Sequence, residues 1–253
     1  MSGNIEEYSQ TYLADFYRYE REHAAPMRRD MTQREIGGCT SKHILEVGCG
    51  MAPMFKEVDD FRQWTVVEPA AEFFHNAKQV KRHHPLSARI HVVRGFFAEV
   101  AASLSPNDFD VILLSGLLHE VPSPHDMLRA AHRLAAPQTL VHGCVPNAHS
   151  FHRLLAVEMG LIDSVFQPSN IQQRLQQPRI YNMRSFRRLF RRAGFNILSA
   201  GTHAFKPFTH EQMSNLWHAG FLTPQMAEGL AKMSKHCPAL GSEIFINAQK
   251  ITG

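Results

Sequence analysis

A glycine-rich segment and a carboxylate that follows it form the clearest candidate site in the sequence. Gly48 and Gly50 stand in the run EVGCG at 46–50, directly after an apolar stretch. Glycine is needed where a backbone turns with positive φ or presses against a ligand, because a Cβ atom would clash there. Glu68 ends the next apolar stretch, eighteen residues after Gly50, where a carboxylate can bind both hydroxyls of a ribose. The pattern predicts a nucleoside site; the alternative is an ordinary strand-to-helix turn followed by a solvated strand end.

Two kinds of sequence pattern, one typical of strands and one typical of helices, alternate along the chain around these residues. Short apolar runs bounded by Gly, Pro or charged turns alternate with amphipathic helical patterns, which is typical of a parallel sheet covered on both faces. We therefore expect an α/β fold with a doubly wound, mostly parallel, seven-stranded Rossmann-like sheet. The predicted strands are 43–47, 64–68, 90–94, 109–115, 139–144, 195–201 and 243–249, and the predicted helices are 5–36, 72–82, 124–135 and 185–193.

The glycine turn lacks the features of a dinucleotide or nucleotide triphosphate site. Pro53 stands where the dinucleotide fingerprint has its third glycine, and no P-loop lysine follows, which disfavours a nicotinamide dehydrogenase. An acid followed by G-x-G resembles the first motif of class I S-adenosylmethionine-dependent methyltransferases, and Glu46, Gly48 and Gly50 match it. The resemblance extends over about 43–250 and implies S-adenosylmethionine as the cofactor.

The resemblance also implies roles for individual residues. Glu46 would support the amino group of the cofactor, the turn of Gly48, Cys49 and Gly50 would lie against its methionine part, and Glu68 would hold the ribose. The other residues expected at the cofactor are Pro69, Gly95, Phe96, Phe97, Ser115 and Leu117.

The segment after the third predicted strand departs from the family pattern. The family usually has an acid after the glycine that corresponds to Gly95, whereas this chain has Phe96. Stacking of Phe96 or Phe97 on adenine would replace the lost hydrogen bond. The alternative is a pair of buried core aromatics.

Histidines follow the fourth and fifth predicted strands and are the candidate catalytic groups. His119 precedes Glu120, an order reversed from the acid-histidine pair common in the family, and would act as a general base. His149 would lie at the same sheet edge as a second catalytic candidate. The alternatives are a capping or core role for His119 and a surface position for His149.

The acceptor is expected to be enclosed by two helical segments. Residues 1–36 form a predicted cap, and 37–253 form the cofactor-binding domain with an inserted lid at 146–182. The cap carries aromatic residues on one helix face, which would either cover the site as a mobile lid or dock permanently. This aromatic face comprises Tyr8, Tyr12, Phe16 and Tyr19, and the predicted substrate-binding residues are Tyr12, Tyr19, Asn147, His152 and Arg153.

Composition narrows the remaining classes of function. The net charge is +4 and does not by itself imply a nucleic-acid partner, although the arginines at 184–192 keep an RNA methyltransferase as an alternative. Four widely spaced cysteines without a C-x-x-C pair indicate a reducing compartment. The first residues do not resemble a leader, and the longest apolar run, 111–118, is too short to span a bilayer. We expect a cytoplasmic protein without a membrane partner.

The sequence thus predicts a methyltransferase that acts on an O or N nucleophile of a small metabolite. A protein that binds the cofactor without catalysis is the rival from another class. No metal site is predicted, although the sixteen histidines leave a histidine-based site open. A homodimer is compatible with the sequence.

Overall fold

A seven-stranded sheet forms the centre of the computed structural model, which describes residues 5–14, 25–175 and 177–251. The strand order is β3-β2-β1-β4-β5-β7-β6. The first five strands pair in parallel, whereas β7 is antiparallel to both β5 and β6. The strands are β1 His43–Val47, β2 Gln63–Glu68, β3 Ile90–Arg94, β4 Phe109–Ser115, β5 Ala135–Pro146, β6 Phe195–His203 and β7 Glu243–Lys250. The predicted fold class and all seven predicted strands are confirmed.

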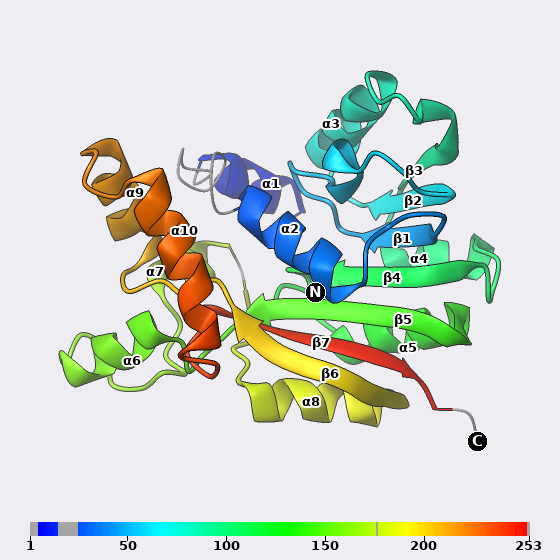
Figure 1. The fold of residues 1–253 in the computed structure, drawn as a ribbon. Coiled ribbons are helices and arrows are strands. Elements are labelled where there is room, and N and C mark those ends of the chain that lie inside the picture. The colour runs from blue at the N-terminus through cyan, green and yellow to red at the C-terminus, as the bar shows by residue number, and fades with distance from the viewer. Residues whose placement is uncertain (1–4, 15–24, 176, 252–253) are drawn as a thin grey trace.

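Helices lie on both faces of the sheet and around one of its ends (Figure 1). The chain passes from β3 at one edge to β4 beside β1, which creates the switch point where doubly wound sheets bind ligands. Figure 1 shows α6, α7, α9 and α10 gathered at the end of the sheet where the parallel strands finish. The α-helices are α1 Ile5–Ala14, α2 Ala25–Glu35, α3 Ala71–Arg82, α4 Phe97–Val100, α5 Pro124–Leu134, α6 Phe151–Glu158, α7 Asn170–Arg174, α8 Met183–Arg192, α9 His210–His218 and α10 Pro224–Lys232, and short 3-10 turns include η2 Met54–Glu57 and η5 Met233–Lys235.

Two apolar clusters fix the layers. One contains Phe186 and Phe190 of α8 with Leu128 of α5, and it packs on one face of the strands. The other contains Trp64 of β2 and Ala77 of α3 on the opposite face. Burial of these side chains on both faces explains why the strands are nearly continuous apolar runs.

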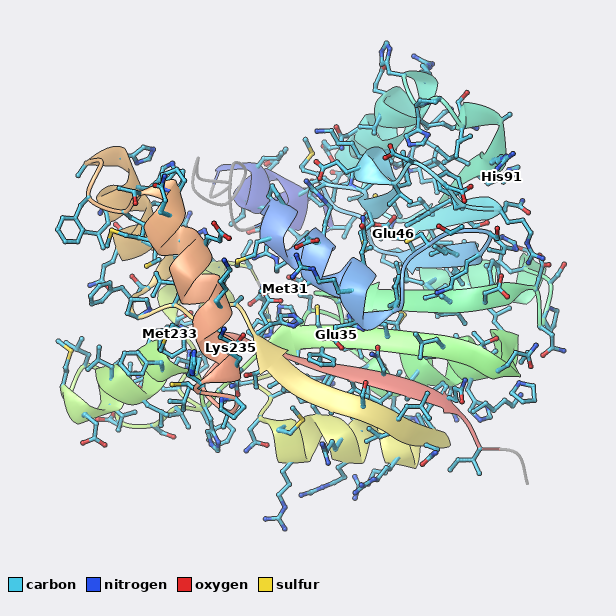
Figure 2. All side chains as sticks on the ribbon, viewed as in Figure 1. Met31, Glu35, Glu46, His91, Met233 and Lys235 are labelled. Carbon is cyan, nitrogen blue, oxygen red and sulfur yellow. The ribbon has the colours of Figure 1, made fainter. Side chains whose placement is uncertain are left out.

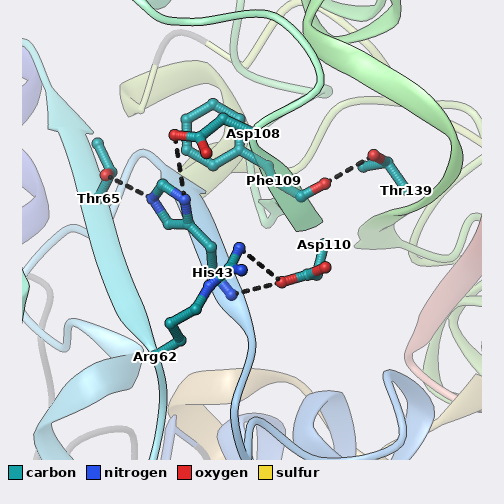
Figure 3. A network of polar contacts seen from close by, with 7 residues as sticks. All are labelled: His43, Arg62, Thr65, Asp108, Phe109, Asp110 and Thr139. Atoms are coloured by element: carbon teal, nitrogen blue, oxygen red, sulfur yellow. Dashed lines mark hydrogen bonds and ion pairs between the residues drawn. The ribbon is translucent and has the colours of Figure 1, made fainter.

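A polar network joins the starting ends of three strands, far from the ends where the site lies (Figure 3). The backbone amide of His43 donates to Asp110 Oδ2 over 2.7 Å, and the His43 ring lies 3.3 Å from Asp108 and from Thr65 Oγ1. Arg62 also reaches Asp110, at 3.3 Å. This arrangement aligns β1, β2 and β4, so we interpret it as structural.

Two parts of the chain differ from the expectations. The described part of the predicted 5–36 helix forms two separate helices, and Phe16 and Tyr19 of the aromatic face lie outside the described residues. Helices α9 and α10, between the strands that end near 201 and begin at 243, were not predicted from the sequence. No helix in the part of the chain that the structure describes is long and apolar enough to cross a membrane.

Candidate functional site

A cavity of about 1060 Å³ opens at the carboxyl ends of the parallel strands. Small-molecule sites usually enclose roughly 300 to 1,000 Å³, so this cavity can hold a cofactor together with a small acceptor. Its wall includes most of the residues predicted from the sequence. These are Tyr12, Glu46, Gly48, Cys49, Gly50, Glu68, Pro69, Phe96, Phe97, Ser115, Leu117 and His119.

The glycine turn after β1 has the backbone that its sequence predicts. Gly48 has φ of +73° and Gly50 has φ of +54°, both in the left-handed region that side chains disfavour. A Cβ atom on Gly48 would stand 3.3 Å from Leu117 Cδ1, and one on Gly50 would stand 3.9 Å from the Tyr12 hydroxyl. The turn therefore presents bare backbone to the cavity beneath Tyr12.

Glu68 at the end of β2 is tied to this turn. Its Oε2 accepts hydrogen bonds from the amides of Cys49 (2.9 Å) and Gly50 (3.2 Å), and its Oε1 accepts one from Ala70 (3.0 Å). Burial raises the pKa of the carboxyl, while the three amides oppose that shift. A carboxylate offers about four acceptor positions, so one remains for a ribose hydroxyl unless a backbone bond exchanges.

Glu46 supports the same turn from below. The Met54 amide donates to its Oε1 and the Trp64 indole N–H donates to its Oε2, each over 2.9 Å. Burial raises the pKa of Glu46 to about 7. Because both oxygens already bind protein donors, the structure gives Glu46 a structural role at the base of the turn, where Figure 2 labels it. The amino-group role remains a prediction.

Among the residues expected near the adenine, some lie in the cavity wall and others belong to the apolar core. Phe96 lines the cavity and is 42% exposed, so its ring is available to stack on a base. Phe97 also touches the cavity but belongs to the apolar core at 1% exposed. Gly95 does not line the cavity; its φ is +151° and a Cβ atom there would stand 2.8 Å from Val100 Cγ2, which explains the glycine. Of the two aromatics, Phe96 is therefore the candidate for stacking.

A carboxylate and a histidine lie side by side in the cavity wall after β4. His119 Nε2 is 3.5 Å from Glu120 Oε1. Burial lowers the pKa of His119 to about 3 and raises the pKa of Glu120 to about 7. Since general bases work best with a pKa near the operating pH, Glu120 suits proton transfer better than His119. Glu120 was not among the catalytic residues predicted from the sequence.

The N-terminal helix α1 closes over this pair. The Tyr8 hydroxyl donates to Glu120 Oε2 over 2.7 Å, and the Gln177 amide donates to Glu120 Oε1 over 2.8 Å. Tyr8 and Tyr12 also pack on Phe73 of α3, with ring centroids 6.4 and 5.4 Å away. One carboxyl group thus holds both α1 and the end of the 146–182 segment.

The predicted residues after β5 are placed differently from the expectation. Asn147 donates to the carbonyls of Ala239 and Gly241 and accepts from the His149 amide, so its amide is used within the fold. Arg153 binds carbonyls of Val165 and Gln167, which shapes the segment after α6. Neither residue lines the cavity, and their role at the substrate stays a prediction.

The two histidines of this segment do not line the cavity either. His149 is exposed, and its ring centroid lies 5.9 Å from that of Phe166. His152 is partly buried, and burial followed by the charges of Lys206 and Arg153 lowers its pKa to about 2. The structure therefore does not bring His149 to the position expected of a catalytic base. The 146–182 segment reaches the cavity through Pro146, Leu175, Gln177 and Pro178 instead.

Further cavity residues were not predicted individually from the sequence. Arg28 of α2, which falls within the predicted cap, Glu243 of β7 and His210 of α9 all line the cavity. The start of α9 could have been found, because Thr209 and Gln212 form a capping box. Among the described residues, no group of three or more His, Cys, Asp or Glu side chains could hold a metal ion.

The pKa of Glu120 predicts a measurable pH dependence. Its folded pKa of about 7 lies above the usual 4.5, so the folded state binds the proton more tightly, and the stability that this contributes is lost as pH rises from about 4.5 through 7. We expect the free energy of unfolding of wild type relative to Glu120→Gln to fall by up to about 3 kcal/mol between pH 5 and pH 8. The measurement is urea unfolding of both proteins across this range.

A matched control is Glu99→Gln, since Glu99 is an exposed carboxylate on the same cavity. It should leave the pH dependence unchanged. The buried His119 contributes the opposite slope in every variant, so it cancels in the comparison. A parallel pH dependence of wild type and Glu120→Gln would contradict the raised pKa.

The residues present fit S-adenosylmethionine. The glycine turn provides a cradle that a Cβ atom at Gly48 would crowd, and Glu68 retains an acceptor position beside it. The Ser115 hydroxyl is buried without a hydrogen-bond partner on the same wall. These features define a nucleoside-binding α/β protein whose site lies at the switch point of the sheet.

Comparison with known protein families identifies the family of this nucleoside-binding protein. Residues 16–200 match the family of proteins described as methyltransferase domain, and the chain belongs to this family. The resemblance to class I S-adenosylmethionine-dependent methyltransferases is therefore confirmed.

Individual relatives agree with this assignment. The chain is 33% identical over 104 residues to a ubiquinone biosynthesis O-methyltransferase of Pseudomonas paraeruginosa, which covers 41% of this chain and 44% of the relative. The chain thus matches less than half the length of this curated relative.

Solved structures share the fold. A methyltransferase from Thermotoga maritima has a TM-score of 0.64 at 13% identity, covering 98% of this chain and all of the other. A phosphoethanolamine N-methyltransferase from Haemonchus contortus, in complex with S-adenosyl-L-methionine, has a TM-score of 0.59 at 15% identity, covering 89% and 52%.

Proposed function

We propose that this chain transfers a methyl group from S-adenosylmethionine to an O or N nucleophile of a small acceptor. The observation that carries the proposal is one cavity that joins the Gly48–Gly50 turn and Glu68 at one end to Glu120 and His119 at the other. The name of the Pseudomonas relative favours oxygen as the nucleophile.

Different residues of this chain would bind the cofactor, align it with the acceptor and accept the proton. When bound, S-adenosylmethionine supplies a methyl group that the positive sulfonium activates. Gly48 and Glu68 would hold the two parts of the cofactor in a fixed position, and such positioning is what methyl transfer requires. Glu120 accepts the proton that the nucleophile loses, while neutral His119 and Tyr8 limit the access of water.

The covering segments support an enclosed small-molecule site. We propose that 1–36 and 146–182 act as covers of a domain that spans 37–253. Both reach Glu120, through Tyr8 and Gln177. The contacts of α1 are those of a docked helix, and opening of this helix would admit the acceptor. We also propose a cytoplasmic location, supported by four cysteines that are free thiols.

The alternative functions have less support. The arginines of α8 would be the contact surface of an RNA methyltransferase, but no residue of α8 lines the cavity. A protein without catalysis would not need a carboxyl group with a pKa of about 7 beside the transfer site.

A thermal-shift experiment tests the proposed function. S-adenosylhomocysteine should raise the melting temperature of the full chain in proportion to the logarithm of its concentration above the dissociation constant, because it binds only the folded state. NAD should produce no shift, because Pro53 replaces the third glycine of the dinucleotide turn. Equal stabilisation by NAD, or none by S-adenosylhomocysteine, would overturn the proposal.

A further inference from the structure

The hydroxyl of Tyr8 occupies one side of the Glu120 carboxyl group. Tyr8 donates to Glu120 Oε2 over 2.7 Å, whereas the Gln177 amide and the His119 ring lie on the Oε1 side, at 2.8 and 3.5 Å. All four residues line the cavity. In the proposed transfer, an oxygen nucleophile must also present its proton to Glu120. The chain therefore supplies, from its own helix α1, the contact that an acceptor hydroxyl would make.

The acid–base chemistry of Tyr8 suits it to this contact. Burial, followed by the negative charge of Glu120, raises the pKa of Tyr8, so its hydroxyl keeps the proton and acts as a donor. Burial raises the pKa of Glu120 to about 7, and the hydrogen bonds from Tyr8 and Gln177 oppose that shift. A hydroxyl that replaced Tyr8 would restore the same bond, whereas loss of Tyr8 alone would leave the buried carboxyl with one donor fewer.

The length of the contact fits a hydroxyl better than an amine. O–H···O bonds lie most often at about 2.7 to 2.8 Å, and N–H···O bonds at about 2.9 to 3.0 Å. The separation of 2.7 Å between Tyr8 and Glu120 Oε2 belongs to the first group. The N–H donor at this carboxyl, the Gln177 amide, is bound to Oε1. The geometry thus offers Oε2 to an O–H donor.

The docking of α1 depends on contacts that can be exchanged. The helix has ten residues, a length at which an isolated helix is marginal in water, so tertiary contacts must hold it. Besides the bond to Glu120, Ser9 Oγ donates to Glu72 Oε2 over 2.9 Å, and the Tyr8 ring packs edge-on against Phe73 with centroids 6.4 Å apart. Loss of the bond to Glu120 should therefore loosen α1 and leave the sheet beneath it intact.

We propose that Tyr8 marks the position of the acceptor hydroxyl, and that the acceptor binds by replacing Tyr8 at Glu120 Oε2. The inference rests on the proposed function and names a hydroxyl as the group that is methylated. Tyr8 is then a positioning residue, which keeps α1 closed over Glu120 until an acceptor arrives. In the transfer, the acceptor oxygen gains the methyl group, its proton passes to Glu120, and the sulfonium of the cofactor becomes a neutral thioether.

The probe for this exchange is 4-methylphenol, which is the side chain of tyrosine as a free molecule. It is titrated calorimetrically, at a pH of 8 where Glu120 is mostly ionised, into the full chain saturated with S-adenosylhomocysteine. Tyr8→Phe should bind the probe about tenfold more tightly than wild type, because no charge-assisted hydrogen bond has to be broken first. Tyr8→Ala, which also frees the space of the ring, should gain at least as much. The amine of the same shape, 4-methylaniline, should gain less.

Two further variants show where the probe binds. Addition of Glu120→Gln to Tyr8→Ala should lower the affinity for 4-methylphenol about tenfold, because an amide oxygen is an uncharged acceptor. Leu13→Ala truncates a side chain of the same helix that is 40% exposed, so it should bind the probe as wild type does. Melting temperatures without the probe check that each variant folds, and Tyr8→Phe carries the test if Tyr8→Ala does not.

Hydrogen exchange separates replacement of Tyr8 from binding elsewhere. In wild type saturated with S-adenosylhomocysteine, 4-methylphenol at saturating concentration should increase the exchange of amides in residues 5–14, because the probe competes with α1 for Glu120. A ligand that bound beside a docked helix would leave this exchange unchanged or lower it. A purely structural role of Tyr8 would not make the protection of α1 depend on the probe.

The outcomes that contradict the inference are distinct from failure of the proposed function. Equal affinity of Tyr8→Phe and wild type for the probe, an affinity of Tyr8→Ala that is independent of Glu120, no binding of the probe to either Tyr8 variant, or unchanged exchange in α1 would overturn it. A larger gain for 4-methylaniline would overturn the assignment to a hydroxyl. Failure of wild type to bind S-adenosylhomocysteine would overturn the proposed function, whereas its binding without these effects would overturn only this inference.

Discussion

Replacement of Glu68 by alanine is expected to weaken S-adenosylhomocysteine binding about ten- to hundredfold. The variant loses the charge-assisted hydrogen bond to the ribose, which is worth about 1.5 to 3 kcal/mol. It also frees the amides of Cys49 and Gly50, which Glu68 holds in the turn that the cofactor would contact. Isothermal titration calorimetry of wild type and variant measures the change in dissociation constant.

Two controls separate recognition from folding. Glu68→Gln keeps an acceptor oxygen and should lose less affinity than Glu68→Ala. Glu99→Ala removes an exposed carboxylate from the same cavity and should leave the dissociation constant unchanged. An unchanged dissociation constant in Glu68→Ala would remove Glu68 from the site.

Glu46→Ala is expected to lower the free energy of unfolding by about 2 to 4 kcal/mol. The variant leaves the Met54 amide and the Trp64 indole N–H buried without an acceptor, and each such group costs about 1 to 3 kcal/mol. Removal of a carboxylate whose pKa burial has raised to about 7 offsets part of that loss. Urea unfolding at pH 7 measures the change.

The comparison variant for stability is Glu228→Ala. Glu228 is exposed and pairs with Lys232 one helical turn away, so its loss should leave the free energy of unfolding nearly unchanged. If Glu46→Ala costs no more than this control, Glu46 does not hold the base of the turn.

The sheet and the cofactor end of the cavity follow closely from local sequence. Parallel strands buried on both faces produce continuous apolar runs, so central strands such as β1, β2 and β4 are visible without knowledge of their neighbours. The carboxyl ends of adjacent parallel strands share one edge, so Gly48 and Glu68 had to lie close together. The spacing of Gly48 and Glu68 along the chain was therefore sufficient to predict that they lie at one site.

The acceptor end depends on contacts between distant segments. Tyr8 and Gln177 meet at Glu120 across 112 and 57 positions of sequence, and no local pattern predicts that meeting. The same limit applies to Asn147, whose side chain donates to the distant carbonyl of Ala239, a contact that no local pattern predicts. A polar residue at the carboxyl end of a strand can form hydrogen bonds either with another part of the fold or with a substrate.

The segment after β6 was missed for a different reason. Signals for its helices were present, in the capping box at Thr209 and in Thr223 followed by Pro224. The regular alternation of strands and helices favoured a direct connection from β6, an edge strand, to its neighbour β7. That omission left out His210, which lines the cavity.

The most direct test of the proposed site is a crystal structure of the full chain with S-adenosylhomocysteine. We predict ligand density across the Gly48–Gly50 turn, with the ribose hydroxyls within hydrogen-bond distance of Glu68 and the sulfur facing Glu120. Density for the nucleoside elsewhere, or a ribose out of reach of Glu68 in a fully occupied site, would contradict the assignment of this cavity to S-adenosylmethionine.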